Sequence, residues 1–277
     1  MASVATLLRD GAALSMSDNG EGPAVVFQHG LGGGEVQVAQ TFPADAGFRR
    51  ITLECRGHGA STLGKGRPFS FDMFADDVLA AADRVGLERF VAGGISMGAA
   101  IAMRLACRRP DRVTGLVLIR PAWTFQRAPA NMLPIAEVAS LILNHGPESA
   151  KAIFAKSQTA ARFKREAPDN LASLLGYFDR PDAAQFAEIL ANIAADGPGV
   201  SANNAAALTV PALIIGNALD AVHPLSAART LAAAIPGAVF AEVSPKSLDS
   251  NRHFAELHTQ ITTFLHAHFN TRSLLPS

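Results

Sequence analysis

The segment Gly94-Ile95-Ser96-Met97-Gly98 places a serine between two glycines, and it joins the apolar run 90–92 to the alanine-rich run 99–106. Glycine has no Cβ atom, so other backbone can pack closely around a serine that is held in a strained φ/ψ region. A tight turn of this kind between a strand and a helix exposes the seryl oxygen at its tip. An ordinary flexible serine loop is the alternative, but the strand and helix patterns on either side favour a nucleophile at Ser96.

A serine hydroxyl needs an imidazole to take its proton and a carboxylate to orient that imidazole. Where such a turn lies in a parallel sheet, the acid and then the histidine follow in the chain, each beyond a strand. Asp220 follows the apolar run 213–215, and His253 follows the run 239–243 and precedes a helical pattern. We predict that Asp220 orients the imidazole and that His253 is the general base. Asp249 is a rival carboxylate, but it lacks a strand directly before it.

Acyl transfer also needs backbone N–H groups that are already directed at the oxyanion. The strand-like run 25–27 leads into His29-Gly30-Leu31-Gly32-Gly33-Gly34, a turn that can expose its amides. We predict that the N–H groups of Leu31 and Met97 form the oxyanion hole, because Met97 follows the nucleophile. The glycine spacing matches neither nucleotide-binding fingerprint, so a phosphate site is not expected here.

Short apolar runs alternate with longer segments of helical periodicity. This alternation predicts an α/β fold with a mostly parallel, doubly wound sheet. The expected strands are residues 24–28, 50–53, 90–92, 115–119, 212–215 and 238–243, and the expected helices include residues 74–85 and 99–108. Pro110 ends the second of these helices, because proline cannot donate the next hydrogen bond.

The pattern changes between residues 121 and 207, where strand-like runs disappear and amphipathic helical segments are broken by proline and glycine. We therefore expect a core domain of residues 1–120 and 208–277, with residues 121–207 inserted as a helical cap, or lid. The basic residues of the insertion are interpreted as solvated helix faces. Four residues are expected to line a substrate pocket: His29, Gly30, Trp123 and Phe125.

The chain of 277 residues is 49% hydrophobic and has zero formal net charge. It is long enough for a large core, and it lacks the basic field that nucleic acid requires. Cys55 and Cys107 are too few for a disulfide framework. The N-terminal residues do not resemble a signal peptide, and no apolar run is long enough to span a bilayer, so we expect a cytoplasmic protein that does not bind membranes.

Four segments together carry a resemblance that extends over almost the whole chain. They are His29-Gly30, Arg56-Gly57-His58-Gly59-Ala60-Ser61, Gly94-Ile95-Ser96-Met97-Gly98-Ala99 and Gly216-x-x-x-Asp220-x-x-x-Pro224. In this order they resemble the α/β-hydrolase superfamily, and within it the small esterase, enol-lactonase and cofactor-free haloperoxidase-like group. The resemblance implies the α/β-hydrolase fold, a Ser-Asp-His triad, a helical cap and no cofactor. The chain departs from the usual pattern at Glu54 and Ile95, and at Arg252, where glycine usually precedes the histidine.

These observations predict a serine hydrolase that cleaves a small carboxylic ester or lactone through an acyl-enzyme intermediate. The alternatives are hydrolysis of a C–C bond, acyl transfer or perhydrolysis on the same triad, and a ligand-binding protein that retains the triad. No metal site is expected, since His266 and His268 occupy alternate positions of a helix and do not face each other. The sequence leaves the physiological substrate and the oligomeric state open.

Overall fold

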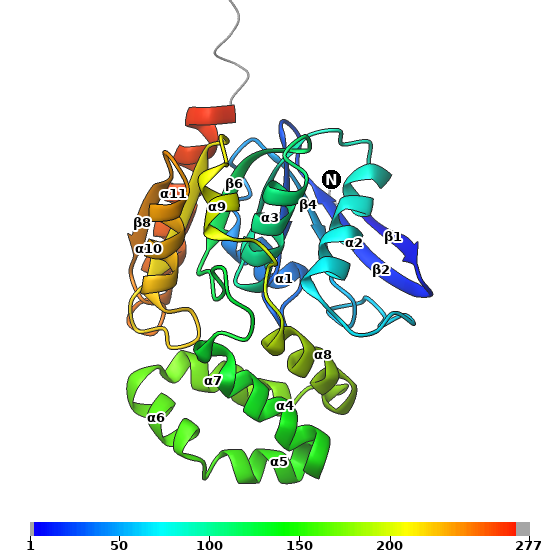
Figure 1. The fold of residues 1–277 in the computed structure, drawn as a ribbon, viewed down its shortest axis with the longest axis vertical. Coiled ribbons are helices and arrows are strands. Elements are labelled where there is room, and N and C mark those ends of the chain that lie inside the picture. Colours follow the sequence, from blue (N-terminus) through cyan, green and yellow to red (C-terminus); the bar gives the residue numbers. More distant parts are fainter. Residues whose placement is uncertain (1–2, 270–277) are drawn as a thin grey trace, which may run out of the picture.

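An eight-stranded sheet forms the centre of the computed structural model, which describes residues 3–269 (Figure 1). The strands lie in the order β1-β2-β4-β3-β5-β6-β7-β8. All neighbours from β4 to β8 are parallel, whereas β1 and β2 run antiparallel to their neighbours. The predicted α/β-hydrolase fold is confirmed. The strands are β1 (Ser3–Arg9), β2 (Ala12–Asn19), β3 (Ala24–Gln28), β4 (Arg49–Leu53), β5 (Phe90–Ile95), β6 (Val113–Ile119), β7 (Ala212–Asn217) and β8 (Val239–Val243).

Helices cover both faces of the sheet, because successive side chains of each strand point to opposite sides. In β3, Val26 packs in one apolar cluster, whereas Val25 and Phe27 pack in the other. The cluster around Val26 includes residues of α2 (Phe71–Arg84), α3 (Met97–Arg108) and α10 (Leu225–Ala234). The opposite cluster includes residues of α1 (Glu35–Thr41) and α11 (Ser250–Phe269).

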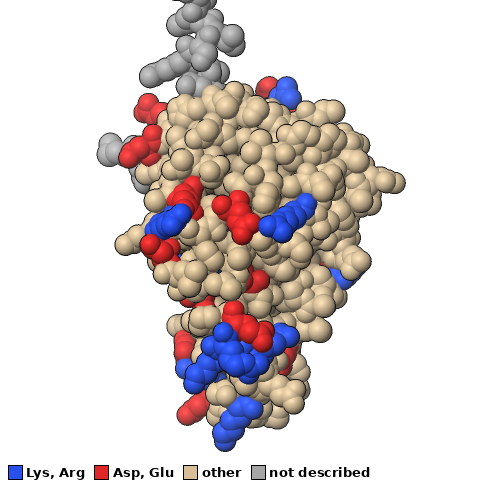
Figure 2. Space-filling model, turned by 90° about the vertical axis from the view of Figure 1, so that its left-hand side faces the viewer, with Lys and Arg blue, Asp and Glu red and all other residues tan. Residues whose placement is uncertain are grey.

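A group of helices between β6 and β7 lies against one end of the sheet, at the bottom of Figure 1. Its members are η1 (Ala130–Met132), α4 (Leu133–His145), α5 (Pro147–Phe154), α6 (Gln158–Glu166), α7 (Pro168–Phe178) and α8 (Ala183–Ala195). The next helix, α9 (Ala202–Ala206), instead packs beside α10. Figure 2 shows lysine and arginine side chains gathered over this helical end of the molecule. Lys151 of α5 is half-exposed and pairs with Asp179. Arg165 of α6 is exposed and pairs with Glu166.

The antiparallel hairpin of β1 and β2 was absent from the expected strands. Arg9 pairs with Ala12 across a two-residue turn, and both turn residues have positive φ, 47° at Asp10 and 74° at Gly11. Asp-Gly is a strong signal for such a turn. The turn signal is therefore in the sequence. The strand was not predicted because Val4 and Leu8 of β1 are exposed, so apolar and polar residues do not alternate as they do in a typical half-buried strand. Within residues 3–269, no helix has the length and apolar character needed to cross a bilayer.

Candidate active site

Ser96 lies at the turn from β5 into α3 with φ 55° and ψ −107°. Residues other than glycine rarely adopt this backbone conformation. The flanking glycines make this turn possible. A Cβ atom at Gly94 would lie 2.6 Å from the carbonyl oxygen of Gln28, and one at Gly98 would lie closer still. The backbone of β3 therefore packs directly against the serine turn. Strain of this kind is typical of functional sites, because the surrounding structure must enforce it.

The imidazole of His223 lies between Ser96 and Asp220. Its Nε2 atom is 2.8 Å from Ser96 Oγ, and its Nδ1 atom is 2.9 Å from Asp220 Oδ1. An ionised carboxylate only accepts hydrogen bonds, so Nδ1–H donates to Asp220 and Nε2 is left to accept the hydroxyl proton of Ser96. The three side chains thus form a continuous chain from nucleophile to base to carboxylate.

The predicted pairing of Ser96 with His253 is wrong. His253 is buried in the first turn of α11, where its Nδ1 donates to the carbonyl oxygen of Ser244 at 2.7 Å. The Oδ1 atom of Asp220 instead accepts both the backbone N–H and the imidazole Nδ1–H of His223. The sequence held a signal for this, a histidine three residues after Asp220. Reasoning from chain order overlooks it, because that rule takes the histidine from beyond the last strand.

Asp220 has further partners on both carboxylate oxygens. Arg120, which follows β6, donates from Nε to Oδ2 at 2.8 Å and from a second guanidinium nitrogen to the same oxygen. Asn170 of α7 donates from Nδ2 to Oδ1 at 3.0 Å. Burial raises the pKa of the Asp220 carboxyl, but the interactions with Arg120 and His223, among them the hydrogen bonds that His223 donates, outweigh it and lower that pKa. Asp220 is therefore an anion over the working pH range of proteins.

The same surroundings keep His223 neutral. Burial lowers the pKa of its imidazole, Asp220 opposes this shift, and the positive charge of Arg120 adds to it. A neutral imidazole is the form that accepts a proton. His223 therefore has both the position and the protonation state of a general base at neutral pH.

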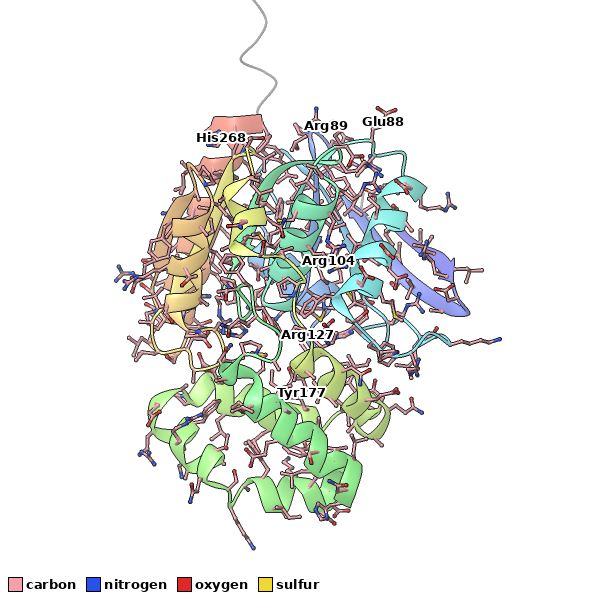
Figure 3. All side chains as sticks on the ribbon, in the orientation of Figure 1. Glu88, Arg89, Arg104, Arg127, Tyr177 and His268 are labelled. Carbon is pink, nitrogen blue, oxygen red and sulfur yellow. The ribbon has the colours of Figure 1, made fainter. Side chains whose placement is uncertain are left out.

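The loop that follows β3 is fixed from two sides next to Ser96. The N–H of Gly30 donates to Gln37 Oε1 at 2.7 Å, and the hydroxyl of Tyr177 donates to the carbonyl oxygen of Leu31 at 3.0 Å. Figure 3 shows Tyr177 on α7, at the junction between the helical group and the sheet. Met97 is the first residue of α3, and the first N–H groups of a helix have no acceptor within it.

A small cavity of about 100 Å³ opens beside the nucleophile. Its lining comes from both the sheet and the helical group. The lining residues are Gly30, Leu31, Gln37, Ile95, Ser96, Arg120, Ile135, Asn170, Ser173, Leu174, Tyr177, Val222 and His223. Of the predicted pocket residues, Gly30 is among them, whereas His29, Trp123 and Phe125 are not.

These three residues have structural positions instead. The ring of His29 is buried, with Nε2 accepting the N–H of Cys55 at 3.0 Å and Nδ1 donating to the carbonyl of Gly30. Trp123 is buried with its ring centroid 5.0 Å from that of Phe71, and Phe125 packs on the same apolar cluster. Sequence reasoning placed the two aromatic residues at the pocket because they begin the insertion, but they pack against the core that supports it.

No cluster of three or more histidine, cysteine, aspartate or glutamate side chains that could hold a metal ion occurs within residues 3–269. Ser96 is only 8% exposed and is one of the residues that line the small cavity.

Comparison with known proteins agrees with the observed fold. The chain is 30% identical over 223 residues to a putative carbamate hydrolase, RutD, of Klebsiella pneumoniae strain 342. The matched region covers 78% of this chain and 80% of that relative. The enol-lactonase from Burkholderia xenovorans LB400 superimposes with a TM-score of 0.71 at 26% identity, covering 94% of this chain and 99% of that one. An esterase from Thermogutta terrifontis has the same fold, with a TM-score of 0.66 at 22% identity over 95% of this chain and 96% of its own. The family described as having the alpha/beta hydrolase fold matches residues 23–254. The chain therefore belongs to the α/β-hydrolase family of enzymes.

Proposed function

We propose that this protein is a serine hydrolase that cleaves a small carboxylic ester or lactone through an acyl-enzyme intermediate. The observation that carries the proposal is the hydrogen-bond chain from Ser96 through His223 to Asp220, with distances of 2.8 and 2.9 Å. Distances of this size are within the reach that proton transfer between nucleophile and base requires.

In the first half of the reaction, Ser96 Oγ attacks the carbonyl carbon of the substrate while its proton passes to His223 Nε2. The N–H groups of Leu31 and Met97 stabilise the oxyanion that forms. The imidazolium then protonates the leaving alkoxide, the C–O bond breaks, and the acyl group remains on Ser96. Asp220 stays ionised throughout and stabilises the imidazolium.

In the second half, water attacks the acyl-enzyme and gives one proton to His223 Nε2. The tetrahedral intermediate collapses, Ser96 Oγ leaves and takes that proton back, and the carboxylic acid is released. In a lactone the leaving oxygen stays attached to the acyl chain, so the product is a single hydroxy acid.

The cavity supports a small acyl group. A volume of about 100 Å³ is well below the roughly 300–1,000 Å³ of typical ligand pockets, which favours a small acyl group over a long one. Ile135 of α4 and Leu174 of α7 give one wall an apolar character. We propose that the inserted helices act as the cap that closes this site and selects the substrate. The names of the relatives make enol lactones and carbamates worth testing beside simple esters.

The test is hydrolysis of p-nitrophenyl acetate, butyrate and octanoate and of small lactones by the wild-type protein and by Ser96→Ala. We expect turnover of the short esters, a lower kcat/KM for the octanoate, and a loss of at least about 10³-fold in Ser96→Ala. Ser140→Ala is the matched control, because Ser140 is an exposed serine of α4. Full activity in Ser96→Ala would refute the proposal. Product analysis with a competing alcohol or peroxide separates hydrolysis from acyl transfer and perhydrolysis.

A further inference from the structure

We propose that Asn170 is a positioning residue for the catalytic carboxylate, so that the seating of α7 on the sheet sets the orientation of Asp220 and His223. The inference rests on the proposed function for its kinetic consequence. Asn170 lies in the first turn of α7 and is only 4% exposed. It comes from the inserted helices, 50 residues before the carboxylate that it contacts.

Every polar atom of the Asn170 side chain faces the loop that carries Asp220. Nδ2 donates to Asp220 Oδ1 at 3.0 Å, and Oδ1 accepts the backbone N–H groups of Ala221 at 2.7 Å and Val222 at 3.3 Å. A carboxamide has both a donor and an acceptor, so it can bind the carboxylate and the two amides that follow it at the same time. An ionised carboxylate does not offer this combination, because it has no donor.

A second asparagine, Asn131, binds a backbone carbonyl of the same loop, whereas Asn170 binds its backbone N–H groups. Asn131 of η1 donates from Nδ2 to the carbonyl oxygen of Val222 at 2.7 Å and to that of Ala122 at 2.8 Å. Val222 is thus bound through its N–H by Asn170 and through its carbonyl by Asn131. Two separate segments of the insertion therefore fix the short loop between the carboxylate and the base.

Both oxygens of the Asp220 carboxylate accept hydrogen bonds. Arg120 binds Oδ2, whereas His223 and Asn170 both bind Oδ1. The guanidinium of Arg120 also lies 3.2 Å from His223 Nδ1. The bond from Asn170 adds to those from His223 in fixing the position of Oδ1 beside the imidazole. The charged groups that act on His223 are Asp220 and Arg120, and His253 lies within electrostatic range of both.

The test compares Asn170→Asp and Asn170→Ala with the wild-type protein. Asn170→Asp keeps the acceptor for the two amides but places a negative charge next to Asp220. We expect kcat to fall by about 30-fold or more with KM changed by less than about threefold. We also expect the acidic limb of the pH profile of kcat/KM to move up by about one unit, since an added anion raises the pKa of His223. Asn170→Ala should lower kcat without this upward shift.

Asn144→Asp is the matched control, since Asn144 is exposed on α4 and bonds only Ser140 among the described residues. It should leave both kcat and the pH profile unchanged. A purely structural role for Asn170 would lower the melting temperature of both Asn170 variants while the pH profile of the folded fraction stayed in place, and that result would overturn the proposal. If Asn170→Asp does not fold, unchanged kcat in folded Asn170→Ala would overturn it equally.

NMR titration of the His223 imidazole separates this proposal from the proposed function. Its pKa should rise in Asn170→Asp whether or not an ester is turned over. A wild-type protein that hydrolyses no ester or lactone, but in which the substitution raises that pKa, would refute the hydrolase proposal and retain the link between α7 and the carboxylate. An unchanged pKa would refute the link.

Discussion

Asp220 and His223 lie three residues apart on one loop, and Oδ1 of the aspartate accepts both the backbone N–H and the imidazole Nδ1–H of that histidine, each at 2.9 Å. The acid and the base therefore form a local unit whose geometry depends on a single short segment. Because this segment is held by Asn131 and Asn170 of the insertion, the unit is joined to the helices that cover the cavity.

Arg120→Met tests the electrostatic balance at the base. Burial and then the guanidinium charge lower the pKa of His223, so removal of the guanidinium should raise that pKa and move the acidic limb of kcat/KM to higher pH. In the wild-type protein this limb should lie below 6.5, the ordinary pKa of histidine, because burial and Arg120 together lower the value. The measurement is kcat/KM of a short ester from pH 4 to pH 9.

Arg127→Met is the control for this variant, because Arg127 is a largely exposed arginine that pairs with Asp196 away from the cavity. Its pH profile should match that of the wild-type protein. An acidic limb that stayed in place or moved to lower pH in Arg120→Met would show that Arg120 does not act on His223 by its charge.

Gly98→Ala tests the packing of the serine turn. A Cβ atom at this position would overlap the backbone carbonyl of Gln28, so either the turn or β3 has to shift. Overpacking of this kind costs about 1–3 kcal/mol of unfolding free energy. The activity should fall as well, because the displaced turn carries Ser96. Urea denaturation followed by circular dichroism measures the first effect, and ester hydrolysis measures the second.

Gly176→Ala is the matched control in α7, since a Cβ atom there meets nothing within 4 Å. It should stabilise the protein by about 0.5–1 kcal/mol, because alanine loses less backbone entropy than glycine in a helix. Equal stability of Gly98→Ala and the wild-type protein would mean that the close approach of Gln28 is not rigid.

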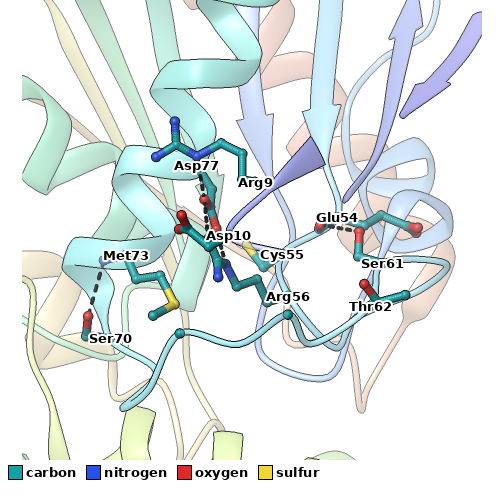
Figure 4. Close-up of polar contacts among 12 residues, drawn as sticks. Arg9, Asp10, Glu54, Cys55, Arg56, Ser61, Thr62, Ser70, Met73 and Asp77 are labelled. Atoms are coloured by element: carbon teal, nitrogen blue, oxygen red, sulfur yellow. Dashed lines mark hydrogen bonds and ion pairs between the residues drawn. The ribbon is translucent and has the colours of Figure 1, made fainter. Parts of the chain in front are cut away.

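A buried ion pair stabilises the loop that follows β4. Arg56 donates from Nε to Asp77 Oδ2 at 2.7 Å, and Arg9 donates to the other oxygen of Asp77 at 3.2 Å (Figure 4). The side chains of Arg56 and Asp77 are each only 1% exposed. Asp77→Asn removes the buried counter-charge of Arg56 and leaves it only the exposed carboxylate of Asp10 at 2.9 Å. The variant should lower the unfolding free energy by about 3 kcal/mol, measured by urea denaturation.

Asp83→Asn provides the comparison, because the Asp83 side chain is 58% exposed where it pairs with Arg112. An exposed pair contributes about 0–1 kcal/mol, so this variant should be close to the wild-type protein. Similar losses in the two variants would contradict the role given to burial.

The fold and part of the site follow from local sequence patterns. The serine turn and the loop of Asp220 each lie within a few residues of a buried parallel strand, and such strands are apolar enough to recognise. The histidine that contacts Ser96 could not be predicted, because two histidines follow the relevant strands and only the packing of α11 shows that His253 donates to Ser244. Asn170 could not be found in this way. Its partner lies 50 residues later in the chain, and no local pattern in α7 distinguishes a buried asparagine from an exposed one.

The most direct test of the central claim, that His223 is the base of Ser96, is labelling by a fluorophosphonate probe in the matched variants His223→Asn and His253→Asn. Asparagine retains an N–H group near the position of Nδ1 and removes Nε2. We expect labelling of Ser96, located by mass spectrometry, to slow by about 10²-fold or more in His223→Asn and to continue in His253→Asn. Loss of labelling in folded His253→Asn, with labelling retained in His223→Asn, would contradict the claim.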